Sequence, residues 1–153
     1  CLLVHGAAKV IAVDVGYGQL DWKLRNDPRV VVLEKTNIRH LDPAGLPFVP
    51  ELVTIDASFI SLKLILPKVR SLIAPEGTVV ALIKPQFEVG KGKVGKGGVV
   101  RSAEEHNRVI EEVCQASTEC GFQVLGVTES PLLGPKGNKE FLLHLKVNFQ
   151  PAA

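Results

Sequence analysis

Two charged side chains stand where neighbouring strands of a parallel sheet would end. Asp56 closes the apolar run 52–56, and Lys84 closes the apolar run 79–84, directly before Pro85. Because the carboxyl ends of parallel strands meet at one edge of an open α/β sheet, we expect this carboxylate and this amine to lie there together. They could align a hydroxyl group and remove its proton, or they could form a structural ion pair between two strand ends. The residues themselves leave both interpretations open.

Two further polar residues follow earlier apolar runs. Asp14 ends the run 9–14, and an acidic residue at the end of the second strand of a nucleotide-binding unit can accept both ribose hydroxyls of a cofactor. Asn37 comes shortly after the run 30–34, where a short amide could bond the edge of an adenine ring. The alternatives are a solvated strand end or helix cap for Asp14 and an ordinary turn residue for Asn37.

A basic, glycine-rich segment precedes Arg101. Of its eleven residues, 89–99, five are glycine and three are lysine, and none is a carboxylate. Such a loop is suited to attracting phosphate, although a flexible loop without a ligand has the same composition. Only Phe87 is nearby, so base stacking is not indicated. The cations beside Lys84 that we predict to bind RNA are Lys91, Lys93, Lys96 and Arg101.

The elements that must position these residues alternate between short β-branched runs and helix-like stretches, which is typical of an α/β domain with a mainly parallel sheet. The predicted strands are 9–13, 30–34, 52–56, 78–83, 123–130 and 140–147. The predicted helices are 19–26, 58–73 with Pro67 as a kink, and 103–120 with Ser102 as its N-cap and Gly121 as its stop. Most strands are apolar throughout, so we expect helices on both of their faces.

Length and composition favour one globular domain. The chain has 153 residues, of which 46% are hydrophobic, and we assign residues 1–148 to the domain and 149–153 to a frayed tail. The net charge of +2 neither requires nor excludes a nucleic-acid partner. No apolar run approaches the roughly 18 residues of a membrane span, so we expect a cytoplasmic protein without membrane contact. The three cysteines form no CxxC motif, which predicts free thiols and no metal site.

Four segments together resemble one family: 12–20, 82–88, 94–101 and 134–140. They are similar to the TlyA (hemolysin A-like) proteins of the FtsJ-like group of ribose 2′-O-methyltransferases. The resemblance implies a Rossmann-like methyltransferase fold with an antiparallel C-terminal strand, S-adenosylmethionine as cofactor, and ribosomal RNA or a ribosomal subunit as partner. By position, Asp56, Lys84 and Glu140 match three of the four catalytic residues of the group. The cofactor-binding positions that it implies are Asp14, Val15, Asn37, Ile38 and Asp56.

The beginning of the chain departs from that pattern. Leu2, Leu3 and Val4, followed by Gly6, are typical of the last turn of a helix that leads straight into a strand. We therefore expect the first strand, the glycine-rich cofactor loop and the first catalytic lysine of the family to be missing, together with its small RNA-binding S4-like domain.

Two other functions remain compatible with parts of the sequence. A non-catalytic RNA- or ribosome-binding module could have kept the fold, although retention of Asp56, Lys84 and Glu140 favours an enzyme. A membrane-damaging hemolysin is the other alternative, but no amphipathic or apolar insertion segment supports it.

Overall fold

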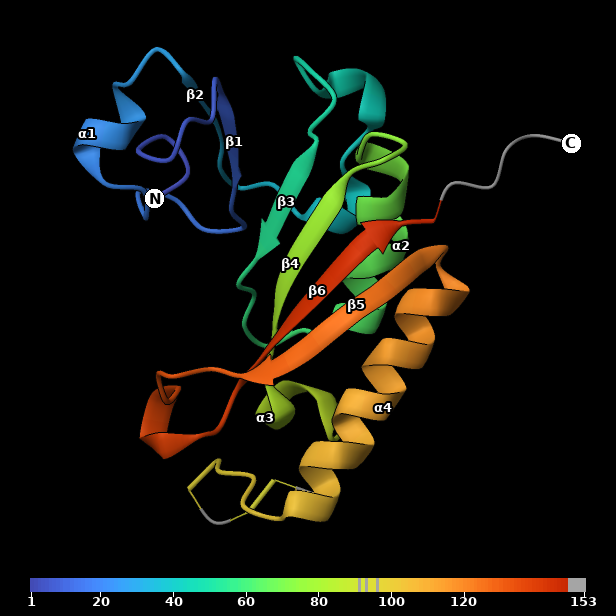
Figure 1. Cartoon of the computed structure of the whole chain (residues 1–153). Helices are drawn as coiled ribbons and strands as arrows, with labels where there is room; N and C mark the ends of the chain where they lie inside the picture. Colours follow the sequence, from blue (N-terminus) through green and yellow to red (C-terminus); the bar gives the residue numbers. More distant parts are fainter. Residues whose placement is uncertain (91, 93, 96, 149–153) are drawn as a thin grey trace, which may run out of the picture. The chain divides into compact units, whose positions relative to one another are not determined.

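The computed structural model describes residues 1–90, 92, 94–95 and 97–148 (Figure 1). The chain divides into two compact units, Cys1–Gly45 and Leu46–Ala153. The assignment of residues 1–148 to one domain stays a prediction, and the tail 149–153 lies outside the described residues.

The first unit is built on a two-stranded parallel sheet. Strand β1 (Val10–Val13) pairs with β2 (Val30–Leu33), and Val10 lies opposite Val30. The connection carries a single helical turn, α1 (Trp22–Arg25), which is shorter than the predicted helix 19–26. Its start is fixed by Asp21, whose side chain accepts a hydrogen bond from Lys23 N, and its end precedes a proline, which disfavours helical backbone in the residue before it. Two 3-10 turns, η1 (Ile38–His40) and η2 (Pro43–Gly45), complete the unit.

The second unit holds a four-stranded mixed sheet with the order β3-β4-β6-β5. Strands β3 and β4 are parallel, whereas β6 is antiparallel to both of its neighbours. The predicted α/β fold with an antiparallel C-terminal strand is confirmed, and each strand lies within two residues of its predicted ends. The strands are β3 (Leu52–Ile55), β4 (Thr78–Ile83), β5 (Phe122–Glu129) and β6 (Phe141–Val147).

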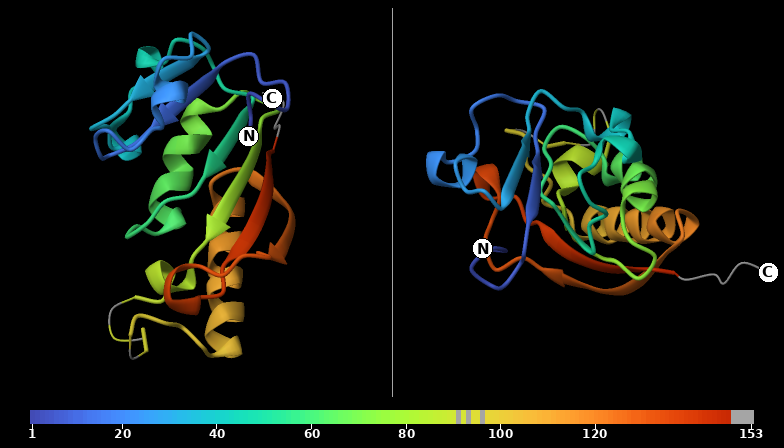
Figure 2. Two further views of the ribbon diagram at one scale, coloured as in Figure 1. Left: turned by 90° about the vertical axis from the view of Figure 1, so that its left-hand side faces the viewer. Right: turned by 90° about the horizontal axis from the view of Figure 1, so that it is seen from above.

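Two long helices cover the same face of this sheet, as Figure 2 shows: α2 (Leu62–Leu72) and α4 (Ala103–Glu119). Helix α2 runs through Pro67 and begins later than predicted, because Ser61 is its N-cap and accepts a hydrogen bond from Lys63 N. Helix α4 begins after Ser102 as predicted, and Gly121 ends it with φ at +87°. The core between sheet and helices consists of fully buried aliphatic side chains, among them Leu66, Val69, Val79, Val109, Val113, Leu143 and Leu145.

Burial alternates along the strands of this unit instead of being uniform. In β4 and β6 every second residue is buried, and Leu52 and Leu125 on the flanking strands are 45% and 46% exposed. The expectation of helices on both strand faces is therefore not met within this unit.

Among the described residues, no helix combines the length and the apolar character that crossing a bilayer requires.

Candidate active site

The predicted pair of Asp56 and Lys84 is present in the second unit. The Lys84 ammonium lies 2.6 Å from Oδ1 of Asp56, and it also donates to the hydroxyl of Ser58 at 3.2 Å. The Lys84 side chain is only 11% exposed, whereas that of Asp56 is 74% exposed. Asp56 therefore forms the solvent-facing side of the pair, and Lys84 forms its buried side.

The positions of Asp56 and Lys84 follow from the pairing of β3 with β4 and from Pro85. Strands β3 and β4 run parallel with Ile55 opposite Ala81, so Asp56 and Lys84 leave the sheet at the same edge. Lys84 then serves as N-cap of a single-turn helix, α3 (Pro85–Glu88), whose first residue is proline. Proline suits this position because the first helical N–H has no partner within the helix. This single-turn helix was not predicted from the sequence.

Glu140 reaches the same end of the sheet from the antiparallel strand. It directly precedes β6, and because Phe141 pairs with Ile83, Glu140 and Lys84 occupy neighbouring strand ends. The Glu140 side chain is buried, with 5% exposure, and its Oε1 accepts a hydrogen bond from Nε2 of Gln86 at 2.9 Å. A Cβ atom at Gly134 would lie 2.2 Å from the same oxygen. The glycine therefore provides the space that this carboxylate occupies.

Asp56, Lys84 and Glu140 form a cluster at this end of the sheet. The donors and acceptors of the cluster suit the removal of a proton from a hydroxyl group. An ammonium group has three N–H donors, and those of Lys84 reach Asp56 and Ser58, which leaves one for a further acceptor. Oδ1 of Asp56 lies 2.6 Å from the ammonium and provides its counter-charge. The second unit thus holds an amine whose orientation is set by two neighbours.

Asp14 and Asn37 lie in the first unit, at the ends of adjacent parallel strands. The Asp14 carboxylate is exposed and its Oδ1 accepts from Gly16 N at 2.6 Å, while its backbone carbonyl accepts from Thr36 N at 3.0 Å. A carboxylate has about four acceptor positions, so this contact leaves capacity for a ligand. Val15 beside it is 71% exposed.

Asn37 acts here as a turn residue. It is the N-cap of η1, and its Oδ1 accepts from Arg39 N at 3.1 Å. This contact uses the side-chain oxygen, while the amide NH₂ group remains a donor. A cofactor contact for Asn37 and for Ile38, the first residue of η1, stays a prediction.

The basic segment is anchored beside the turn that carries Glu140. The buried amide of Asn138 accepts from Val100 N and donates to the carbonyl of Gly98, both at 3.0 Å. Arg101 follows this anchor and is exposed. The other predicted RNA-binding residues, Lys91, Lys93 and Lys96, lie outside the described residues.

Several residues around the cluster were not predicted from the sequence. Among them, Ser58, Gln86, Gly134 and Asn138 each contact a predicted residue or its segment. Phe59, which is 90% exposed, lies with its ring centroid 4.9 Å from that of Phe87, so aromatic side chains are less sparse here than the sequence indicated. Cys1, Cys114 and Cys120 are free thiols, as predicted.

The sequence of the chain is similar to those of known proteins. Residues 1–147 match the family model of the FtsJ-like methyltransferase. The chain is 51% identical over 146 residues to "Putative rRNA methyltransferase YqxC" of Bacillus subtilis, covering 95% of the chain and 52% of that protein. It is 51% identical over 145 residues to the 16S/23S rRNA (cytidine-2′-O)-methyltransferase TlyA of Mycobacterium tuberculosis, covering 95% of the chain and 54% of that protein. The chain thus spans about half the length of these curated relatives.

A solved structure is similar over the same region. A "Putative hemolysin" from Streptococcus thermophilus superposes with a TM-score of 0.94 at 45% identity, covering 98% of the chain and 55% of that protein. The fold seen here is therefore shared with a solved relative, across the strands and helices that carry the cluster.

Proposed function

The chain belongs to the FtsJ-like methyltransferase family, and we propose that it transfers a methyl group from S-adenosylmethionine to a ribose 2′-hydroxyl of ribosomal RNA. The observation that carries this proposal is that Lys84, Asp56 and Glu140 lie at the same end of the four-stranded sheet. The name of one relative agrees with it, since the Mycobacterium tuberculosis protein is named as a 16S/23S rRNA (cytidine-2′-O)-methyltransferase.

The acceptor groups in the first unit suit the cofactor. An exposed carboxylate at the end of a parallel strand can accept both hydroxyls of a ribose, and Asp14 is such a group. We propose that Asp14 binds the ribose of S-adenosylmethionine, with Val15, Asn37 and Ile38 beside the adenosine. The predicted cofactor contact of Asp56 is a separate proposal within the second unit. When bound, the cofactor supplies an electrophilic methyl group on a positively charged sulfur.

The residues of the chain then need only align one hydroxyl and remove its proton. Lys84 would take or share the proton of the hydroxyl group, whose oxygen would receive the methyl group that the bound cofactor supplies. Asp56 stabilises the resulting ammonium at 2.6 Å. The buried carboxylate of Glu140 orients the hydroxyl and the amine from the neighbouring strand end.

RNA binding is assigned to the basic segment. Arg101 and the lysines at 91, 93 and 96 would neutralise backbone phosphates, which gives affinity without reading sequence. Asn138 keeps the end of that segment beside Glu140, and this supports binding of RNA close to the cluster. With ribosomal RNA or a ribosomal subunit as partner, we expect the protein to act in the cytoplasm.

The test is product analysis. The chain is incubated with S-adenosylmethionine labelled in its methyl group and with unmodified ribosomal RNA, and the RNA is then hydrolysed with alkali. A methylated 2′-oxygen cannot attack the adjacent phosphate, so the label should appear in an alkali-resistant dinucleotide. Label in a mononucleotide would show methylation of a base, and RNA binding without any transfer would favour a non-catalytic module.

A further inference from the structure

Glu88 is a buried carboxylate for which the methyl transfer described above has no use. It is the last residue of α3, it is 8% exposed, and it lies on the same helical turn that Lys84 begins. Burying an ionised carboxylate is costly unless hydrogen bonds compensate for the lost water. The groups that donate hydrogen bonds to the Glu88 carboxylate therefore indicate its role.

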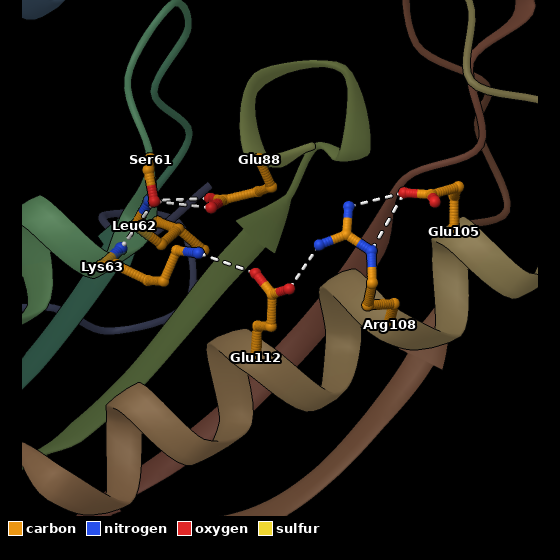
Figure 3. A network of polar contacts seen from close by, with 7 residues as sticks. All are labelled: Ser61, Leu62, Lys63, Glu88, Glu105, Arg108 and Glu112. Carbon is orange, nitrogen blue, oxygen red and sulfur yellow. Dashed lines mark hydrogen bonds and ion pairs between the residues drawn. The ribbon is translucent and has the colours of Figure 1, made fainter. Parts of the chain in front are cut away.

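Both oxygens of Glu88 bind the beginning of α2 (Figure 3). Oε2 accepts from the hydroxyl of Ser61 at 2.6 Å, and Oε1 accepts from Leu62 N at 2.7 Å. Ser61 is the N-cap of that helix. Glu88 thus binds the point at which the loop after β3 becomes helix α2.

That loop, residues 56–61, carries Asp56 and Ser58, the two partners of the Lys84 ammonium. Its first end is fixed by the pairing of β3 with β4, and its last end is fixed by Glu88. Between them Phe59 has φ at +62°, a conformation that a residue other than glycine keeps only when its surroundings hold it there. The loop's arrangement around Lys84 therefore depends on its contacts with α3.

We propose that Glu88 is a positioning residue for methyl transfer, which holds the 56–61 loop so that Asp56 and Ser58 stay within reach of Lys84. The proposal rests on the function proposed above. Glu88 is buried against the beginning of α2, and it acts by joining the segment that follows Lys84 to the segment that follows Asp56.

Three variants of the chain test this role. Glu88→Ala removes both contacts, and we expect kcat to fall about 100-fold with little change in KM for RNA or in the Kd of S-adenosylmethionine. Glu88→Gln should keep kcat within a few-fold of the unsubstituted chain, because the amide oxygen can accept from Leu62 N and the NH₂ group can donate to Ser61. Ser61→Ala removes one of the two contacts and should lie between them.

The matched control is Glu112→Ala. The carboxylate of Glu112 also binds α2, through Lys63 at 2.9 Å, and it pairs with Arg108 on α4, but it does not touch the 56–61 loop (Figure 3). This variant removes a carboxylate that binds the same helix, α2, so its kcat should equal that of the unsubstituted chain. An equal loss in Glu88→Ala and Glu112→Ala, or equal losses in Glu88→Ala and Glu88→Gln, would overturn the proposal.

A structural measurement decides the same question without activity. Crystal structures of Glu88→Ala and Glu88→Gln give the distance from Lys84 Nζ to Asp56 Oδ1, which we expect to lengthen in the first and to stay near 2.6 Å in the second. An unchanged distance in Glu88→Ala contradicts the positioning role. Absence of methyl transfer by the unsubstituted chain, with the distance responding as expected, would instead reject the proposed function and leave the positioning role in place.

Discussion

The ammonium of Lys84 lies 2.6 Å from Oδ1 of Asp56, although the lysine side chain is 11% exposed and the aspartate side chain 74% exposed. A pair with one partner in solvent contributes about 0–1 kcal/mol to folding, so stability alone gives little reason for it. The pair lies at the end of the sheet, with Asp56 exposed to solvent. A hydroxyl group that arrives from solvent can therefore reach the amine and its counter-charge.

Gly134→Ala should impair the site through one added methyl group. The glycine has φ −73° and ψ −176°, which any residue adopts, so the obstacle is steric: Oε1 of Glu140 would lie 2.2 Å from the new Cβ atom. We expect about 1–3 kcal/mol of destabilisation and a roughly 10- to 100-fold lower kcat as Glu140 is displaced. Thermal unfolding and steady-state transfer assays measure both. Gly126→Ala, where nothing lies within 4 Å, is the control, and equal effects at both positions would contradict this role of Gly134.

Asp14→Ala should weaken binding of S-adenosylmethionine. Loss of hydrogen bonds to a charged acceptor corresponds to a roughly 10- to 100-fold higher Kd in calorimetric titration. Asp42→Ala is a matched control, because Asp42 accepts from the backbone two residues ahead, Ala44 N at 2.9 Å, as Asp14 does from Gly16 N at 2.6 Å. An unchanged Kd in Asp14→Ala would remove this residue from the cofactor site.

Arg101→Ala should reduce the salt dependence of RNA binding. If Arg101 neutralises one phosphate, the slope of log K against log salt concentration should become shallower by about 1. Lys146 is exposed and lies at the end of β6 remote from Glu140, so Lys146→Ala should leave the slope unchanged. Filter binding over a series of salt concentrations gives both slopes, and identical slopes for the two variants would argue against an RNA contact at Arg101.

Acid titration of the first unit should reveal the pair of Asp27 and Arg29. Side-chain hydrogen bonds from Arg29 to Asp27, the shorter at 2.7 Å, lower the pKa of Asp27 from its ordinary 3.8 to about 2. Because the folded pKa is below the unfolded value of roughly 3.9, the pair stabilises the folded chain above that pH, and the contribution is lost as the pH falls toward 2. A ¹³C-detected titration should give a midpoint near 2, and Arg29→Ala should raise it toward the ordinary value, because only the hydrogen bond from the backbone N of residue 29 to Oδ1 of Asp27 remains. A midpoint near 4 in the unsubstituted chain would show that the pair does not persist in solution.

Strands were predictable here because each is a short β-branched run bounded by turn residues. The run 78–83 is a clear case, since its predicted ends coincide with those of β4. The charged residues at strand ends were predictable for the same reason, because the end of a run marks the edge of a sheet. The length of helix α1 was overestimated, because Asp21 was not recognised as its N-cap.

The residues that support the cluster could not be predicted, because their roles depend on contacts between distant segments. Gln86 and Glu88 are ordinary polar residues in sequence, and only the pairing of β4 with β6 and the packing of α3 against α2 give them partners. Gly134 offered a faint signal as a glycine in a turn, but its requirement comes from the Glu140 side chain and not from its backbone angles.

The most direct test of the account is single-turnover methyl transfer by Lys84→Ala, with calorimetric titration of S-adenosylmethionine on the same sample. Lys139→Ala, an exposed lysine paired with Glu129, serves as control. Loss of the proton acceptor should slow transfer by about 10²- to 10⁴-fold while the cofactor Kd stays the same, and the control should react at the normal rate. Full turnover by Lys84→Ala would contradict the account, because the amine held at 2.6 Å from Asp56 would then have no part in the reaction.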